Sequence, residues 1–312
     1  MMQEPKAPPA PIGVVYNTSM TRPDAALAIA ALYVASSRRD ARVNGICVNG
    51  AGLDAAIFCD IVARFYTSTA RAPSSNIAPP VGFDASSPPA SSSAMVEAVV
   101  KKTKTDGQPQ YVRSIQRVTD TAAPDALLRN AITFSAEAVV VLSAPATWLA
   151  RSLALAGSRE QYRQRVKRIV IVEGGDLDSD AAAAKALIAS LPFPAVSVGP
   201  EVAQALSVPV SRIQGAFTWA PANPVADAVT ASGLPEVRLQ DVAAVHYALH
   251  PDSGLFEVTG GRLQLEASKR DACADALVAF ATAKPAAPPA RGGRGAGLPD
   301  GLAKNFAPVL FS

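Results

Sequence analysis

Cysteine is scarce in this sequence, which contains three cysteines among 312 residues. Cys47, Cys59 and Cys273 are widely spaced, and no Cys-x-x-Cys pair occurs. An odd number of distant cysteines excludes a disulfide framework. We therefore expect all three to be small, buried side chains of the core.

The sequence has little excess of positive over negative charge, and it has no long apolar runs. The formal net charge is +3, with 18% charged and 49% hydrophobic residues. No basic stripe with interleaved aromatic residues is present, so the sequence predicts no nucleic-acid partner. The apolar stretches are short and interrupted by polar residues, so it predicts no membrane-spanning helix. What is present is enough apolar material for a globular chain with a large core.

Strands and helices alternate along the chain, which predicts an α/β fold with a mostly parallel sheet. An apolar run at 12–16 leads through a polar loop into an alanine-rich helical pattern at 25–35, and the runs at 138–142 and 168–172 are typical of strands covered on both faces. Further strands are expected at 43–48 and 195–198, and a hairpin over 256–266 is expected to turn at Gly260-Gly261. Helices are expected at about 53–66, 95–104, 123–134, 148–156, 159–167, 181–191 and 241–249, and one more is expected to start at 201.

The boundaries of the fold are predicted from composition. We expect one domain over residues 1–283, a Pro- and Ser-rich loop insertion at about 67–110, and a flexible or loosely docked tail at 284–312. The loop is a candidate lid, because long loops in compact domains are usually functional or mobile. We do not expect the polar, proline-rich segment 1–11 to act as a signal peptide. The location is left open: cytoplasmic, or exported with the signal peptide replaced by a methionine.

Four segments, in this order, resemble the motifs of one enzyme family. The loop 17–24 (NTSMTRPD) matches DTDPGxDD, and 142–150 (LSAPATWLA) is similar to LGPLTNLA after a Val-rich strand. Segment 167–175 (KRIVIVEGG) resembles RIVxMGG, and 240–251 (QDVAAVHYALHP) resembles HDPLAVAYALDP. These are motifs of the inosine–uridine-preferring nucleoside hydrolases. The resemblance implies a Rossmann-like, mostly parallel central sheet flanked by helices.

The resemblance also implies a reaction and a metal. Members of that family hydrolyse the N-glycosidic bond of ribonucleosides and form homo-oligomers. Their calcium ion is held by first-loop carboxylates, a threonine backbone carbonyl and the aspartate of the His-Asp pair, an all-oxygen shell that suits a hard cation. At matching positions this chain has Asp24, Thr147 and Asp241, which are its candidate metal ligands.

Other positions of that site differ in this chain. Ser19 stands where the family has a ligand and general base, and Asn17 replaces another carboxylate. Pro23 replaces the aspartate that contacts ribose, and Gln240 replaces the histidine that serves as leaving-group acid. We therefore expect calcium to bind weakly or not at all, since fewer anionic ligands lower the affinity for a hard cation.

The surviving residues predict a polar, nearly neutral pocket at one edge of the sheet. If hydrolysis persists, Asp241 and Glu173 are the candidate catalytic residues, and Glu173 or Asp176 is the candidate for the role of the base. The residues expected to line the pocket are Asn17, Ser19, Asn49, Thr147, Glu173, Gln240 and Asp241. Such a pocket suits a nucleoside or sugar held by hydrogen bonds.

The three candidate metal ligands also have structural alternatives. Asp24 follows a proline in the first turn of a helix, where its charge favours the helix dipole. Thr147 and Asp241 each stand where a helix N-cap is expected.

Two other patterns remain open in the same way. His246 and His250 are four residues apart, a spacing that suits either a metal pair or ordinary packing. The acidic run at 176–180 is typical of a cation loop or of a solvated turn.

Two functions are compatible with these residues. One is an active N-glycoside hydrolase with a remodelled pocket, and the other is a catalytically inactive protein on the same fold that binds a ligand or partner. Loss of the base, the acid and the ribose-binding loop together favours the second, because each loss alone commonly lowers a rate by orders of magnitude.

Overall fold

Three adjacent strands form the centre of the sheet, and their sequences are almost wholly apolar. The computed structural model of the protein describes residues 11–70, 80–86, 93–174, 186–187, 189–191 and 195–287. The strands are β1 (Ile12–Thr18), β4 (Ala138–Leu142) and β5 (Val166–Val172), and β4 is buried along its whole length. Branched side chains favour strands, and a run without polar alternation suits a strand covered on both faces.

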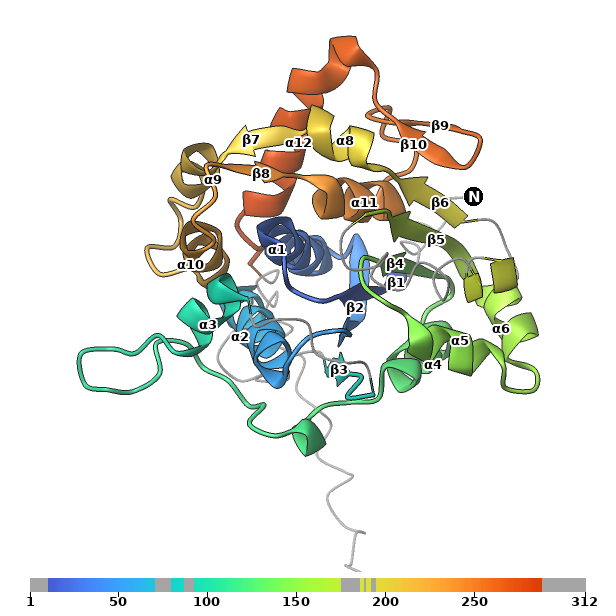
Figure 1. The fold of residues 1–312 in the computed structure, drawn as a ribbon, viewed down its shortest axis with the longest axis horizontal. Helices are drawn as coiled ribbons and strands as arrows, with labels where there is room; N and C mark the ends of the chain where they lie inside the picture. The colour runs from blue at the N-terminus through green and yellow to red at the C-terminus, as the bar shows by residue number, and fades with distance from the viewer. Residues whose placement is uncertain are drawn as a thin grey trace, which may run out of the picture.

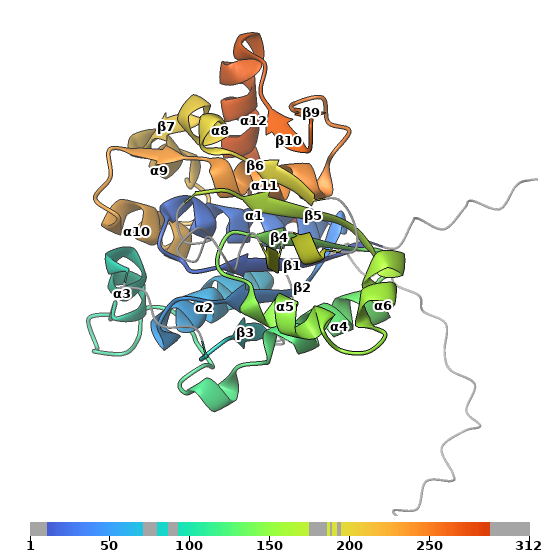
Figure 2. The ribbon, with the colours of Figure 1, turned by 45° about the vertical axis from the view of Figure 1, so that its right-hand side comes forward.

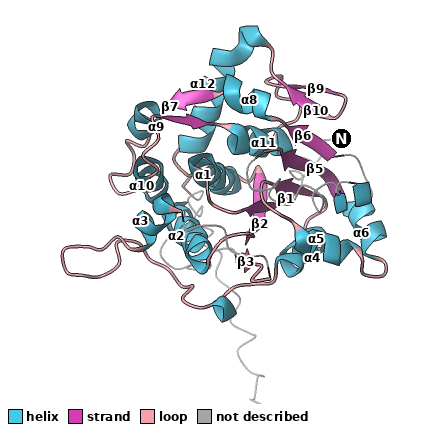
Figure 3. Ribbon diagram, in the orientation of Figure 1, coloured by secondary structure: helices cyan, strands magenta, loops and turns pink. Residues whose placement is uncertain are grey.

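The described strands form an eight-stranded sheet in the order β3-β2-β1-β4-β5-β6-β10-β9. β2 (Ala41–Val48), β3 (Val81–Phe83), β6 (Ala195–Val198) and β10 (Arg262–Gln264) are parallel to their inner neighbours, whereas β9 (Glu257–Thr259) is antiparallel to β10. From β1 the chain moves outward to β3 and then returns to β4 on the other side (Figures 1 and 3). Ligands of α/β proteins bind where the strand order reverses in this way.

Side chains of the central strands alternate between two hydrophobic clusters, one on each face of the sheet. Val139 and Val141 belong to one cluster, and Val140 and Leu142 to the other. The first is completed by α1 (Pro23–Arg38), α2 (Leu53–Ala70), α10 (Pro224–Ala231), α11 (Gln240–Leu249) and α12 (Arg270–Thr282), and the second by α4 (Pro124–Phe134), α5 (Thr147–Leu153) and α6 (Ser158–Arg165) (Figure 2). The predicted sheet flanked by helices is confirmed.

Helix α1 lies at the centre of the helical layer on the first face. Every residue from Pro23 to Ala35 is buried, and the helix contacts α2, α10, α11 and α12. A helix that is apolar all round has to be covered all round. Its alanines let the neighbours approach closely, and its first turn carries Asp24 into the interior.

The remaining elements surround this core. β7 (Ser207–Pro209) and β8 (Glu236–Arg238) form a separate antiparallel pair. The other described elements are α3 (Ala94–Val100), α8 (Pro200–Ala205), α9 (Val210–Ala216) and the 3-10 turns η1 (Val118–Asp120) and η3 (Ala267–Lys269).

The segment expected as a loop insertion at about 67–110 includes the end of α2, β3 and α3, and its described residues 101–110 belong to no named helix or strand. α2 continues to Ala70, and the Thr67 and Thr69 hydroxyls donate to carbonyls four residues earlier. β3 pairs with β2, and α3 packs against α2 and α10. The helix expected at 95–104 is present as α3, whereas a strand as short as β3 shows no periodicity between prolines and serines. Residues 71–79 and 87–92 lie outside the described residues, as do most of the helix expected at 181–191 and residues 288–312 of the tail.

Other boundaries differ at strand and helix ends. The helix expected to reach residue 167 ends at Arg165, because Val166 already pairs with Ala138 as the start of β5. The helix expected at 148–156 runs from Thr147 to Leu153. α12 has no counterpart among the predicted helices.

The predictions about cysteine and membranes concern the described residues. All three cysteines are unpaired and buried, as expected. None of the described helices is long and apolar enough to cross a membrane.

Candidate functional site

The carboxyl ends of five parallel strands bring polar side chains to one edge of the sheet. Backbone bonds tie the strand ends together: Asn49 N–H donates to the Thr18 carbonyl, Ser143 N–H to the Asn17 carbonyl, and Asp84 N–H to the Val48 carbonyl. The polar residues at or just after these strand ends, from β1 to β5, include Asn17, Ser19, Asn49, Asp84, Ser143 and Glu173.

Asp241 lies at this edge in the first turn of α11, and so comes from a helix rather than from a strand end. Its backbone N–H donates to Oδ2 of Asp24 at 2.8 Å. Asp24 therefore caps the start of α11 rather than of its own helix, whose N-cap is Arg22. The structure thus brings together the two aspartates that are 217 residues apart in the sequence.

The guanidinium of Arg22 lies between these two carboxylates. Its Nη2 is 2.7 Å from Oδ2 of Asp241 and donates to Ser143 Oγ at 2.8 Å. Its Nε is 3.7 Å from Oδ1 of Asp24, and its Nη1 is 3.4 Å from Oε1 of Gln240. The Asp24 and Asp241 side chains are 3% and 0% exposed, against 28% for Arg22. Arg22 is therefore the most exposed group of this buried trio.

The charges of this trio are strongly coupled. The negative charge of Asp241 raises the pKa of Arg22, so the guanidinium stays protonated. Burial, and then the charge of Asp241, raise the pKa of Asp24, although Arg22 acts in the opposite direction. Burial and the same two carboxylates also raise the pKa of Tyr16 on β1. One guanidinium thus faces two carboxylates in a place with little solvent.

The β1–α1 loop owes its path to a strained turn. Met20 has φ 58°, in the left-handed region, which costs about 1 kcal/mol or more for a residue other than glycine. The Thr18 hydroxyl accepts the Met20 N–H at 3.1 Å, and the hydroxyls of Ser19 and Thr21 lie 3.3 Å apart. The chain then reaches Arg22 in extended conformation just before Pro23 starts the helix.

The side-chain amide of Asn17 is held on both sides. Nδ2 donates to the carbonyls of Ala144 at 2.8 Å and Pro145 at 3.2 Å. Oδ1 accepts from the Trp148 indole N–H at 3.2 Å. The reverse orientation would point an oxygen at two oxygens and an N–H at an N–H, so these partners fix the amide. Its oxygen is turned away from the carbonyls of the β4–α5 loop.

Gln240 joins α11 to the ends of two strands. Its Nε2 donates to the backbone carbonyls of Glu173 at 2.8 Å and Val198 at 2.9 Å. Both amide hydrogens are therefore used in holding the helix against β5 and β6. Gln240, expected to stand in place of a leaving-group acid, thus forms structural hydrogen bonds.

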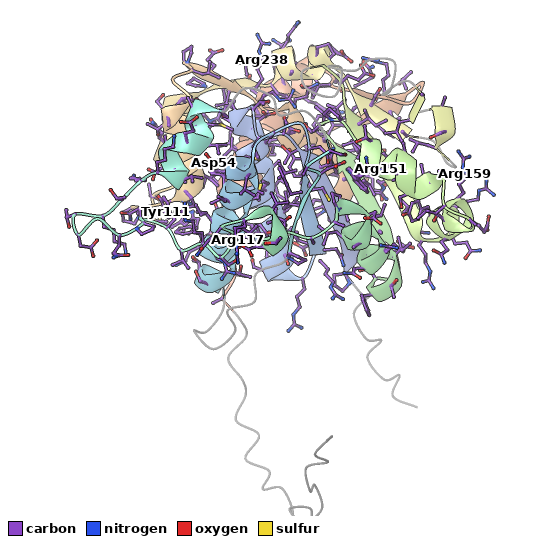
Figure 4. The ribbon with its side chains drawn as sticks, turned by 60° about the horizontal axis from the view of Figure 1, so that its bottom comes forward. Asp54, Tyr111, Arg117, Arg151, Arg159 and Arg238 are labelled. Atoms are coloured by element: carbon purple, nitrogen blue, oxygen red, sulfur yellow. The ribbon has the colours of Figure 1, made fainter. Side chains whose placement is uncertain are left out.

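Asp84 is a residue of this edge that the sequence reasoning missed. Its Oδ2 is 2.8 Å from Nη2 of Arg151, 3.3 Å from the Thr147 hydroxyl and 3.2 Å from Asn49 Nδ2. Arg151 comes from α5 and is labelled in Figure 4. Burial alone would raise the pKa of Asp84, but hydrogen bonds from Ser86 and Arg151 hold it below its usual value. The only signal in the sequence is the short apolar run 81–83 directly before it.

Glu173 is paired with an arginine in the same way. Arg262 of β10 contacts it with two nitrogens, Nη1 at 2.8 Å from Oε1 and Nη2 at 2.8 Å from Oε2. Glu201 lies 3.1 Å from the same Nη2. This two-point geometry is the strong form of a carboxylate–guanidinium contact.

The structural alternatives have mixed outcomes. Thr147 is not an N-cap, because the cap is Ala146 and Thr147 is the first helical residue. Asp241 is not an N-cap either, because it is the second residue of α11, whose N-cap is Leu239. His246 and His250 pack their rings 5.2 Å apart, each against Phe280. Among the described residues no group of three or more His, Cys, Asp or Glu side chains is placed to hold a metal. The acidic run 176–180 lies outside the described residues.

Comparison with known proteins rests on structure alone. No family model and no curated sequence matches this chain. An inosine–uridine-preferring nucleoside hydrolase from Bacillus anthracis superposes with a TM-score of 0.60 at 15% identity, covering 87% of this chain and 99% of that one. The chain has a nucleoside-hydrolase-like fold.

Two further structures extend this likeness. A purine-preferring ribonucleoside hydrolase from Gardnerella vaginalis gives a TM-score of 0.59 at 13% identity, covering 86% of this chain and 99% of that chain. The type III effector protein XopQ, solved in complex with adenosine diphosphate ribose, gives a TM-score of 0.62 at 17% identity, covering 89% and 95%. At these identities the likeness establishes the fold and no more.

Proposed function

We propose that this chain is a nucleoside-hydrolase-fold protein that binds a ribosyl compound at the carboxyl edge of its sheet without hydrolysing it. The observation that carries the proposal is the pairing of three carboxylates with three arginines. Asp241 is paired with Arg22, Glu173 with Arg262 and Asp84 with Arg151.

The two candidate catalytic carboxylates are occupied by arginines. Oδ2 of Asp241 accepts from Arg22, and both carboxylate oxygens of Glu173 contact Arg262. A general base has to be within hydrogen-bond reach of the water that it activates, and these oxygens are bound by N–H donors instead. The amides of Asn17 and Gln240 are used internally. This supports the loss of both the base and the acid of an N-glycoside hydrolase.

The same pairing supports binding of a ligand rich in hydroxyl groups. Each ion pair is close to neutral as a unit, and its guanidinium keeps several N–H donors in a fixed plane. Arg22 and Thr147 are partly exposed and Arg151 is exposed, so donors reach solvent at this edge. The structure of XopQ, which has a similar fold, was solved in complex with adenosine diphosphate ribose. A ribosyl compound is therefore the ligand class that we propose.

Two measurements on one protein test the proposal. Calorimetric titration with inosine, uridine, ribose and adenosine diphosphate ribose is expected to show binding of at least one of them. Chromatography of inosine and uridine incubated with the protein is expected to show no release of base beyond that of an Asp241→Asn variant.

Matched arginine variants locate the binding. Arg151→Gln removes the exposed partner of Asp84 and is expected to weaken binding several-fold. Arg129→Gln removes an exposed arginine paired with Asp125 on α4 and is expected to leave binding unchanged. Base release at enzymatic rates, lost in Asp241→Asn, contradicts the claim about hydrolysis. Failure of all four compounds to bind contradicts the claim about the ligand.

A further inference from the structure

Arg22, Asp24 and Asp241 are arranged like a cation site in which an arginine side chain provides the positive charge. Two carboxylates from the first turns of α1 and α11 face one guanidinium from the β1–α1 loop. The contact to Asp241 is direct at 2.7 Å, and the contact to Asp24 is longer at 3.7 Å. The Ser143 hydroxyl completes the partners of Nη2.

Electrostatics shows why a cation is needed here. The two aspartates are almost wholly buried, and the Asp24 carboxylate accepts the backbone N–H of Asp241 itself. Taking two like charges out of water without a counter-ion is strongly unfavourable. Removing one partner of a buried ion pair therefore leaves a charge that the fold has to compensate by another means.

A calcium ion does not fit the donor set as it stands. Such an ion takes six to eight oxygen ligands. Here one oxygen of Asp241 is bound by Arg22 and one oxygen of Asp24 by the Asp241 N–H. Oδ1 of Asn17 is bound by Trp148, and the Ala144 and Pro145 carbonyls are bound by the Asn17 amide. Most of these oxygens are therefore already bound within the chain, which leaves too few for such an ion.

We infer that Arg22 is a tethered replacement for a divalent cation, so that removing its charge turns this edge into a site for hard divalent cations. Oδ1 of Asp241 has no hydrogen-bond partner among the residues that the structure describes. Without the guanidinium, Oδ2 of Asp241 and Oδ1 of Asp24 lose the cation that they contact. This inference is independent of ligand binding at the edge.

Cation-dependent stability tests the inference. Thermal unfolding is measured in chelator and in millimolar calcium or manganese chloride. The wild type is expected to unfold at the same temperature in all three. Arg22→Met, which keeps the volume and removes the charge, is expected to lose on the order of 10 °C in chelator. It is expected to regain several degrees with either divalent cation, but not with potassium.

Three further variants separate charge from packing. Arg38→Met removes an exposed arginine at the end of the same helix and is expected to change nothing. Arg22→Lys keeps a charge and is expected to stay indifferent to divalent cations. The triple variant Arg22→Met, Asp24→Asn, Asp241→Asn has no charges to balance and is expected to be stable without a cation, even if Arg22→Met alone does not fold in chelator.

Several outcomes overturn the inference. One is a wild type stabilised by calcium, which would mean that the ion enters despite Arg22. Another is an Arg22→Met protein that is indifferent to divalent cations. A third is a triple variant as unstable as Arg22→Met in chelator, because packing rather than charge would then explain the loss.

Discussion

Restoring a family carboxylate at Asn17 is predicted to destabilise the protein rather than to repair a metal site. Asn17→Asp exchanges the two amide hydrogens that hold the Ala144 and Pro145 carbonyls for a carboxylate oxygen. Two hydrogen bonds of about 1 kcal/mol each are lost, and the buried carbonyls are left unsatisfied for about 1–3 kcal/mol more. The side chain is fully buried, so we expect the free energy of unfolding to fall by about 4 kcal/mol.

The effect is predicted to depend on pH. A protonated aspartic acid can donate to one of the two carbonyls, so its pKa in the folded state is expected to lie above the unfolded value of about 4. The folded state then holds its proton to higher pH, and the loss of stability grows as the pH rises above about 4.

Urea unfolding followed by circular dichroism measures this loss at two pH values. Asn130→Asp, at an exposed position of α4, is the matched control and is expected to change the free energy by less than about 0.5 kcal/mol. An Asn17→Asp protein within about 1 kcal/mol of the wild type at neutral pH would refute the assigned amide orientation. So would a gain of calcium binding in that variant.

Three other predictions test the packing around the edge. Gln240→Ala removes the bonds to the Glu173 and Val198 carbonyls and is expected to lower the free energy of unfolding by about 2 kcal/mol in urea; no loss would mean that these bonds do not hold α11. Gly45→Ala places a Cβ 2.3 Å from Leu127 Cδ1 and is expected to lower the free energy of unfolding by about 1–3 kcal/mol. The double variant with Leu127→Ala is expected to lose less stability than the sum of the two single variants. Strict additivity would contradict the clash. Burial, and then His250, lower the pKa of His246 to about 4. The unfolded chain therefore binds more protons between about pH 6.5 and 4, so stability falls by up to about 3 kcal/mol as the pH drops through that window. His246→Phe is expected to flatten this fall, while the exposed-site control Asn130→Asp keeps it.

The fold was predictable where the sequence carries long, continuous signals. The run at 138–142 is a buried strand with the same bounds in the structure. Gly260 and Gly261 both have positive φ, 57° and 77°, and turn the predicted hairpin between β9 and β10. Such a turn needs residues that accept left-handed backbone at two successive positions. In these places local chemistry and tertiary structure agree.

Short elements and distant partners were not predictable. β3 has three residues and exists because β2 offers it a parallel edge, with Ile46 opposite Val81. Asp84 follows it and is visible as a site residue only once that strand is known. The partners Arg22 and Asp241 are 219 residues apart, and no spacing rule connects them. A single sequence identifies groups that can pair, but the packing of α1 against α11 decides which of them meet.

The identity of the cation decides which chemistry this edge retains. A guanidinium and a divalent ion both neutralise buried carboxylates, and both can face an oxygen-rich ligand. A divalent ion also binds water directly and lowers its pKa, which produces a nucleophile near neutral pH. A guanidinium has no open coordination position and only donates hydrogen bonds. If Arg22 is the resident cation, the edge keeps a positive charge beside its two carboxylates and keeps donors for hydroxyl groups, and it loses the means to activate water. Binding of a ribosyl ligand should then be the same with and without chelator, and a chelator-sensitive affinity in the wild type would contradict this argument.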